Sequence, residues 1–202
     1  MRKPLRLRRY LVHFSSHNIP QVFTDVLVLG SGVAGLTAAL ALPDDVSVLV
    51  ATKGELSEGS TAEAQGGVAA AVGSDDSPQE HFEDTTEVGC GLCAEEAVRA
   101  VTQEGPERLA QLTRMGVAFD REGEGFSLTR EGGHRRARIL HANGDATGRA
   151  IAGTLTSRVR ERRQVEVYEG TFALDLLTLD ATCHGALVWN ETHGLMMVRA
   201  KQ

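Results

Sequence analysis

The chain has 202 residues, of which 42% are apolar and 24% are charged, and its 22 glycines contrast with only 4% aromatic residues. This is the composition of a globular protein with a buried core. It excludes a wholly disordered chain, a collagen, a coiled coil and a disulfide-stapled miniprotein. The formal net charge is −6 and the body of the chain is acidic, which argues against nucleic acid as a partner.

Residues 1–23 differ from the rest of the chain. Five basic side chains and no acidic one lie within the first ten residues, namely Arg2, Lys3, Arg6, Arg8 and Arg9. We expect residues 1–23 to form a basic, disordered extension, with a mitochondrial-type presequence or a membrane-surface contact as alternatives. A twin-arginine signal fits less well, because the stretch from His13 to Gln21 is polar and contains Pro20.

The stretch from Val26 to Pro43 carries no charge. Its length would suit a membrane span, but its three glycines and terminal proline favour a strand, a tight turn and a helix, and so no membrane segment. Residues 26–29 form a continuous apolar run typical of a strand buried on both faces, and residues 33–42 are rich in Ala and Leu, as in a helix. Together with a second strand at residues 46–50, these two segments predict a β-α-β unit with parallel pairing of its strands.

Residues 52–76 resemble a long loop, which in a compact domain is either functional or disordered. Ser77 is then followed by Pro78 and, three residues on, by Glu80, which predicts a capped helix running to about Val88. A second helix is expected over residues 94–103, interrupted at Gly105-Pro106, and a third to Met115, closed by Gly116.

Residues 117–142 are expected to form loops and short strands, and residues 145–160 a helix that begins at Asp145 or Thr147. Four strands follow, over residues 165–168, 173–179, 186–189 and 195–199. His184-Gly185 and Glu191–Gly194 are the predicted turns. The fold class is therefore α/β, with a parallel sheet and an antiparallel β-meander.

The three cysteines, Cys90, Cys93 and Cys183, are few and odd in number, which argues against an oxidising compartment and favours the cytoplasm. Cys90 and Cys93 form a C-x-x-C pair, but neither further zinc ligands nor a thioredoxin-like context accompanies it. We expect incidental small apolar side chains and no metal site.

The strongest motif is G-x-G-x-x-G, formed by Gly30, Gly32 and Gly35 between the first strand and the helix. The first glycine allows a tight turn, the second lets a pyrophosphate approach the backbone, and the third lets the helix pack closely on the strand. The helix N-terminus then offers free N–H groups and a partial positive charge to the phosphates. In this setting the motif predicts dinucleotide binding.

At the end of the second strand, NAD-binding proteins usually have an acidic residue that binds the ribose. Here the sequence is Val-Ala-Thr-Lys, ending at Lys53, so an NAD-dependent dehydrogenase fits poorly. Lys53 is either a ligand of a phosphate or ribose hydroxyl or a solvated lysine. A second glycine-rich segment follows, from Glu58 to Gly67, whose small residues would let backbone lie against a flat ligand.

The chain contains five sequence blocks in this order: G-S-G-V-A-G, T-K-G, E-G-S-T-A-E-A-Q-G-G, L-T-R-E-G-G-H and R-I-L-H-A-N-G-D-A-T-G-R. Together they resemble the succinate dehydrogenase and fumarate reductase flavoprotein superfamily over about residues 24–200, and within it the branch that oxidises L-aspartate. The resemblance implies a Rossmann-like FAD-binding domain of the glutathione-reductase type.

Membrane-complex members of this superfamily have a histidine that carries covalent FAD before the A-Q-G-G stretch, and the matching position here is Ser60. The resemblance therefore implies non-covalent FAD. The motif and the resemblance together predict these cofactor-binding residues: Gly30, Ser31, Gly32, Val33, Ala34, Gly35, Lys53, Ser60, Thr61, Ala62, Glu63, Ala64, Gln65, Gly66 and Gly67.

Glu131, in the T-R-E-G-G-H block, matches the acid that orients the substrate; otherwise it is an exposed loop glutamate. The basic run Arg130–Arg138 is either a positive approach for a dicarboxylate or a solvated loop with counter-charges at Glu122, Glu124 and Glu131. We expect His134 and His141 to be structural or peripheral.

Members of the superfamily are much longer than 202 residues. Residues 24–202 are therefore expected to be the N-terminal part of an FAD-binding domain, incomplete, without the capping and C-terminal helical domains that carry most of the catalytic residues. The implied reaction converts L-aspartate to iminoaspartate, with oxygen or fumarate as electron acceptor, and feeds quinolinate synthase in NAD biosynthesis. The chain alone is expected to be inactive. The alternatives are a fumarate reductase or succinate dehydrogenase-like flavoprotein and a non-catalytic FAD- or ADP-binding module.

Overall fold

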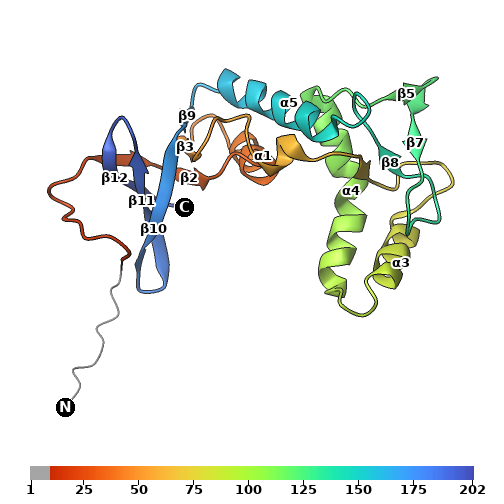
Figure 1. Cartoon of the computed structure of the whole chain (residues 1–202), viewed down its shortest axis with the longest axis horizontal. Helices are drawn as coiled ribbons and strands as arrows, with labels where there is room; N and C mark the ends of the chain where they lie inside the picture. The colour runs from red at the N-terminus through yellow and green to blue at the C-terminus, as the bar shows by residue number, and fades with distance from the viewer. Residues whose placement is uncertain (1–9) are drawn as a thin grey trace, which may run out of the picture. The chain divides into compact units, whose positions relative to one another are not determined.

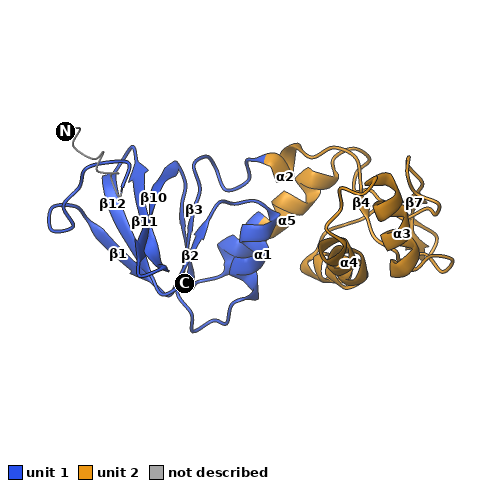
Figure 2. Cartoon of the chain, turned by 90° about the horizontal axis from the view of Figure 1, so that it is seen from below, with its two compact units in different colours: residues 1–59, 156–202 blue, residues 60–155 orange. Residues whose placement is uncertain are grey.

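The computed structural model describes residues 10–202 (Figure 1). The five basic residues of the predicted extension, Arg2 to Arg9, lie outside the described residues. The chain divides into two compact units (Figure 2). Unit 1 combines residues 1–59 with residues 156–202, and unit 2 contains residues 60–155.

Unit 1 contains two sheets and a helix. Its elements are β1 (Gln21–Thr24), β2 (Val26–Leu29), α1 (Val33–Ala41), β3 (Val48–Ala51), β9 (Val165–Tyr168), β10 (Thr171–Leu179), β11 (Thr182–Asn190) and β12 (Gly194–Ala200), and the last turns of α5 (Thr147–Glu161).

The parallel sheet has the order β2-β3-β9, with β3 in the centre and all four of its residues buried. The predicted β-α-β unit is thus confirmed, with its second strand starting at Val48 instead of Val46. A strand with neighbours on both edges and cover on both faces must be apolar throughout, which explains the run Val-Leu-Val-Ala.

The predicted meander is also present. Strands β10, β11 and β12 pair antiparallel in sequence order. The apolar core of unit 1 joins β3 with β11 and β12, through Leu49, Ala186, Val188 and Val198 among others. This burial of one sheet against the other fixes the carboxyl end of β3, where a dinucleotide would bind in such a fold.

The prediction of a disordered extension is wrong for its described part. β1 includes residues 21–23 and pairs in parallel with β12, Gln21 opposite Met197. Upstream, Tyr10, Phe14 and Ile19 pack against the second apolar cluster of the meander. These apolar side chains are scattered among polar ones, so only the presence of an uncovered sheet face gives them a place to bury.

The predicted turn at His184-Gly185 is also wrong, because both residues lie within β11. The turn is at Asp180 and Ala181, whose φ values of 49° and 61° suit a two-residue hairpin turn. Gly185 marks a close approach: a Cβ there would overlap the carbonyl oxygen of Val198 on β12. The expected turn at Glu191–Gly194 does join β11 and β12.

Unit 2 contains most of the helical residues and short strands. Its elements are α2 (Ser60–Glu63), β4 (Val68–Ala69), α3 (Pro78–Val88), α4 (Glu95–Met115), β5 (Arg121–Glu122), β6 (Gly125–Phe126), β7 (Leu128–Thr129), β8 (Ile139–Leu140) and the first turns of α5. The predicted loop 52–76 therefore contains a short helix and a strand.

The predicted start of α3 is confirmed. The Ser77 side chain accepts a hydrogen bond of 3.1 Å from the Glu80 N–H, and Pro78 occupies the first helical position. A proline at the first helical position costs no hydrogen bond, because the backbone N–H of that position has no partner within a helix. α3 ends at Val88, as expected.

The predicted break at Gly105-Pro106 is wrong, since α4 continues from Glu95 to Met115 with Pro106 inside it. A proline within a helix removes one backbone hydrogen bond and crowds the preceding turn. Thr102 and Leu109, one turn to either side, are both buried. Packing on both sides of the proline therefore stabilises the helix across it. Gly116 ends α4 in the left-handed conformation, as predicted.

Replacing Pro106 with Ala should raise the free energy of unfolding by up to about 3 kcal/mol, because the missing helical hydrogen bond is restored. The measurement is urea denaturation followed by circular dichroism. Pro78→Ala is the matched control and should give no gain, because Pro78 is at the helix start. Equal effects of the two substitutions would contradict this account of α4.

Candidate functional site

In unit 1, the turn between β2 and α1 is built around its glycines. Gly30 has φ +102° and its N–H donates to the Ala51 carbonyl (2.8 Å), which ties the turn to the end of β3. A Cβ at Gly35 would overlap the Gly30 carbonyl oxygen and lie 3.1 Å from Val28. The helix can approach the strand this closely only because position 35 has no side chain.

The start of α1 suits an anionic ligand. Gly32 is the N-cap, its lack of a side chain leaves no cap hydrogen bond, and Val33 and Ala34 are exposed. The first N–H groups of a helix have no partner within it and carry a partial positive charge. No acidic side chain lies in the first turn to repel a phosphate.

Ser31 and Lys53 have different positions relative to this turn. Ser31 is buried and its hydroxyl is 3.0 Å from that of Thr52 at the end of β3. That contact joins the turn to the neighbouring strand. Lys53 is exposed directly after β3, so its ammonium is available to a ligand at the carboxyl edge of the sheet.

In unit 2, the glycine-rich segment Ser60–Gly67 begins with α2 and lies against the start of α5. A Cβ at Gly148 would lie 2.6 Å from the Ala64 carbonyl oxygen, and the Gly148 N–H donates to that oxygen (3.3 Å). Gly148 therefore permits a close contact that fixes the segment. The D-A-T-G-R block contains this glycine, but its sequence did not indicate the role.

A pocket of about 270 Å³ lies where the glycine-rich segment meets the start of α5, with Gln65 and Arg149 among its lining residues. Most of the segment is accessible: Ser60, Glu63, Ala64, Gln65 and Gly67 are exposed. Small exposed residues with a fixed backbone would let a flat ligand contact main-chain groups. The segment's arrangement thus fits its predicted role.

Glu131 lies in a tight turn after β7. Its carbonyl accepts a hydrogen bond from the His134 N–H (3.2 Å), and Gly133 has φ +82°. A Cβ at Gly133 would lie 2.8 Å from Val88 at the end of α3, so the turn packs on that helix. The Glu131 side chain remains 55% exposed, and its Oε1 is 3.8 Å from Nε2 of His141.

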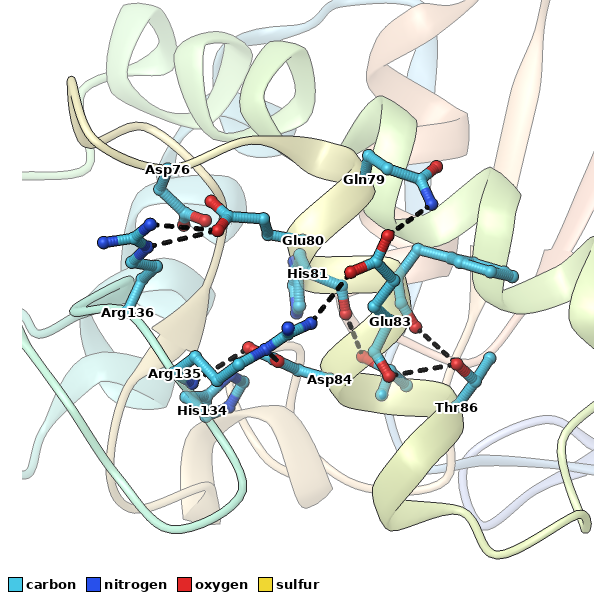
Figure 3. Close-up of polar contacts among 12 residues, drawn as sticks. Asp76, Gln79, Glu80, His81, Glu83, Asp84, Thr86, His134, Arg135 and Arg136 are labelled. Carbon is cyan, nitrogen blue, oxygen red and sulfur yellow. Dashed lines mark hydrogen bonds and ion pairs between the residues drawn. The ribbon is translucent and has the colours of Figure 1, made fainter.

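Figure 3 shows Arg135 and Arg136 of the basic run against the acidic residues of α3. Arg138 is fully buried, binds both carboxylate oxygens of Asp76 at 2.8 Å and lies 2.9 Å from Asp84. Arg135 contacts Asp84 and Glu83, and Arg136 contacts Glu80 at 3.0 Å.

These pairings correct one prediction. The expected counter-charges at Glu122, Glu124 and Glu131 do not hold the run, and Arg138 is neither solvated nor open to a dicarboxylate. Sequence distance explains the error: Asp76 and Asp84 precede Arg138 by more than fifty residues, and only the packing of α3 brings them together. Arg130 is exposed, and the dicarboxylate role stays a prediction for that residue.

Charge and burial compete in this cluster. Burial raises the pKa of Asp84, but hydrogen bonds from Arg135 and the charges of Arg138 and Arg135 outweigh it, and the net pKa lies below its usual value. His81 is buried beside Arg138 and His134, and burial, followed by those two charges, lowers its pKa. His81 and His134 thus belong to the packing of α3 against the loop, as expected of a structural histidine.

The predicted site residues fall into two groups, and each is described within its own unit. Unit 1 brings together the glycine turn, Ser31 and Lys53 at one edge of the parallel sheet. Unit 2 brings together the glycine-rich segment and the strands that lead to Glu131. The glycine turn, which a Cβ would obstruct, fits the pyrophosphate of a dinucleotide.

A groove of unit 1 lies elsewhere. It measures about 810 Å³ and is lined by residues of β1, β10 and β12 with Tyr10 and Phe14, and by none of the predicted cofactor residues. In the part of the chain that the structure describes, no helix is both long enough and apolar enough to cross a membrane.

Comparisons with known proteins agree with this geometry. A family model described as FAD binding domain matches residues 25–202. L-aspartate oxidase from Synechocystis is 47% identical over 160 residues, covering 79% of this chain and 29% of that protein. L-aspartate oxidase from Streptomyces coelicolor is 50% identical over 159 residues, covering 78% and 27%. The chain thus spans less than a third of the length of these two relatives.

Two solved structures share the fold of this chain. The Mycobacterium smegmatis Sdh1 complex in its apo form is 32% identical, with a TM-score of 0.84 over 91% of this chain and 34% of that one. The quinol fumarate reductase FrdA of E. coli is 28% identical, with a TM-score of 0.85 over 91% and 32%.

Gly35→Ala should lower the free energy of unfolding by about 1–3 kcal/mol, because its methyl group must displace the backbone of the turn. FAD affinity should fall with it. The matched control is Gly153→Ala in α5, where a Cβ meets no atom within 4 Å and should stabilise the helix by about 0.5–1 kcal/mol. Unfolding curves and FAD titration of both variants test this. A harmless Gly35→Ala would refute the close approach.

Arg138→Met should lower the free energy of unfolding by about 3–5 kcal/mol, because buried Asp76 loses its ion-pair partner and buried Asp84 keeps only Arg135. Arg130→Met, at an exposed position of the same loop, should leave it essentially unchanged. Chemical denaturation of both variants gives the comparison. Similar small effects would mean that the Arg138 cluster is solvated in solution.

Proposed function

This chain belongs to the FAD binding domain family, and on that premise we propose that it takes part in the FAD-dependent oxidation of L-aspartate to iminoaspartate. In this proposal the chain supplies much of the FAD site and one carboxylate that recognises the substrate. The product would enter the quinolinate route of NAD biosynthesis, in the cytoplasm.

When bound, FAD would supply the redox chemistry of the oxidation of L-aspartate, with oxygen or fumarate as the final electron acceptor. The protein's own residues bind and orient. The glycine turn and the N-terminus of α1 would hold the pyrophosphate, with Lys53 beside it. Ser60 has no ring nitrogen with which to bind the flavin covalently, which supports non-covalent FAD.

The observation that carries the substrate assignment is the Glu131 carboxylate. It is 55% exposed, its turn is anchored on α3, and that turn follows β7 of the small sheet whose strand β4 follows the glycine-rich segment. An accessible carboxylate of fixed position is suited to bind the ammonium group that distinguishes L-aspartate from succinate or fumarate. The curated relatives that carry the name L-aspartate oxidase support the same assignment.

A fumarate reductase or succinate dehydrogenase-like flavoprotein is the second candidate, supported by the TM-score of 0.85 to the E. coli fumarate reductase subunit. Ser60 argues against the covalent versions of that class and leaves the non-covalent ones. A non-catalytic FAD- or ADP-binding module is the third candidate. A direct interaction with quinolinate synthase belongs to the first candidate.

The experiment is to compare L-aspartate-dependent peroxide release with fumarate reduction in the FAD-loaded protein expressed from its own gene. We expect the first activity, and Glu131→Gln should reduce it. Fumarate reduction without oxidation of L-aspartate would favour the second candidate, and FAD binding with neither activity the third. For the isolated 202-residue chain we expect weak FAD retention and no turnover. A stoichiometrically yellow chain that oxidises L-aspartate would contradict that expectation and support the reaction.

A further inference from the structure

The sheet β4-β8-β7 places one histidine between the glycine-rich segment and Glu131. Val68 pairs with Leu140, so Gly67 before β4 lies opposite His141 after β8. A Cβ on Gly67 would lie 3.1 Å from Cε1 of the His141 ring and 2.6 Å from the Leu140 carbonyl oxygen. The imidazole therefore packs directly on the backbone of the last glycine of the segment.

Nε2 of His141, the ring atom next to Cε1, faces the loop that contains Glu131. Thr129 pairs with Ile139, which makes it the diagonal neighbour of His141 on the same face of the sheet. Its Oγ1 lies 3.0 Å from His141 Nε2. This hydrogen bond fixes the orientation of the ring, whichever of the two groups donates.

The same Nε2 lies 3.8 Å from Oε1 of Glu131. The ring is mostly buried, with 19% of the side chain exposed, whereas Glu131 is 55% exposed. A half-exposed glutamate beside a fixed imidazole has fewer accessible positions than a free one. The contacts thus run from the Gly67 backbone through His141 to the carboxylate, all within unit 2.

We propose that His141, held by Thr129, is a positioning residue that sets the Glu131 carboxylate relative to the glycine-rich segment for recognition of a substrate ammonium group. This inference rests on the proposed function, in which Glu131 binds that group. His141 itself need not touch the substrate. It acts by restricting where the carboxylate lies, so that less freedom is lost when the ammonium binds.

The test compares two ligands, L-aspartate, which has an ammonium group, and succinate, which lacks it. The dissociation constant of each ligand from the protein is measured at saturating FAD by the change in flavin absorbance. Glu131→Gln should weaken L-aspartate about tenfold, the loss expected for a hydrogen bond to a charged group. His141→Phe, which keeps a ring and loses both nitrogens, should weaken it about threefold, because the carboxylate would then lose more freedom when the ammonium binds. Succinate binding should change in neither variant.

Conservative variants separate positioning from packing. Thr129→Val should reproduce the effect of His141→Phe, and Thr129→Ser should restore L-aspartate affinity because it keeps the hydroxyl. His193→Gln, an exposed histidine in the β11–β12 turn of unit 1, is the matched control and should bind both ligands normally.

A second measurement needs no flavin. In the free chain, the imidazole NMR signals of His141 should move in Glu131→Gln and in Thr129→Val, while those of His193 stay in place. Unmoved His141 signals in both variants would overturn the proposed contacts.

The outcomes of the ligand comparison are distinct. Equal losses for L-aspartate and succinate in His141→Phe, or no loss at all, would overturn the positioning role while Glu131→Gln still upholds the proposed function. If the unmodified protein does not distinguish the two ligands and Glu131→Gln has no effect, the proposed function and this inference both fail.

Discussion

Close approach of backbone to backbone at glycine is the constraint on which the rest of this structure depends. In unit 1 the carbonyl oxygen of Gly30 occupies the space that a side chain at position 35 would need. Because Gly35 has no side chain, α1 can pack on β2. In unit 2 the glycine-rich segment lies against Gly148, and Gly67 lies under the ring of His141. A methyl group at any of these points would push apart the segments that form the candidate site.

Charge pairing around Arg138 supplies a second constraint, in unit 2. The guanidinium of Arg138 pairs with both Asp76 and Asp84 without access to water, and the exposed Arg135 and the half-buried Arg136 add outer contacts to α3. Burying such a cluster contributes little to the net free energy of unfolding compared with apolar packing. The cluster does favour one arrangement of the loop on α3, because displacing any partner leaves an unpaired buried charge. Its effect is to fix the loop from Glu131 to Arg138 in one position on α3, and this is what gives Glu131 a defined place.

Local features could be predicted from the sequence where neighbouring residues and the tertiary packing favour the same structure. The Ser77 cap, the left-handed Gly116 and the G-x-G-x-x-G turn were each found where the sequence placed them. The errors arose where distant residues decide. Pro106 lies within α4 because Thr102 and Leu109, one turn to either side, are buried, and β1 forms because β12 offers an edge with which it can pair.

The sequence by itself determined the β-α-β unit, the glycine turn and the order of the blocks that carry the family resemblance, because these depend on residues close together in the chain. Only the tertiary structure decided the partners of the basic run and the place of His141 between Gly67 and Glu131. The ion pairs of Arg138 and the contact of Gly67 with His141 join residues more than fifty positions apart. Spacing along the chain does not encode them, since they arise when helix α3 and the sheet β4-β8-β7 pack and bring their side chains within hydrogen-bonding reach.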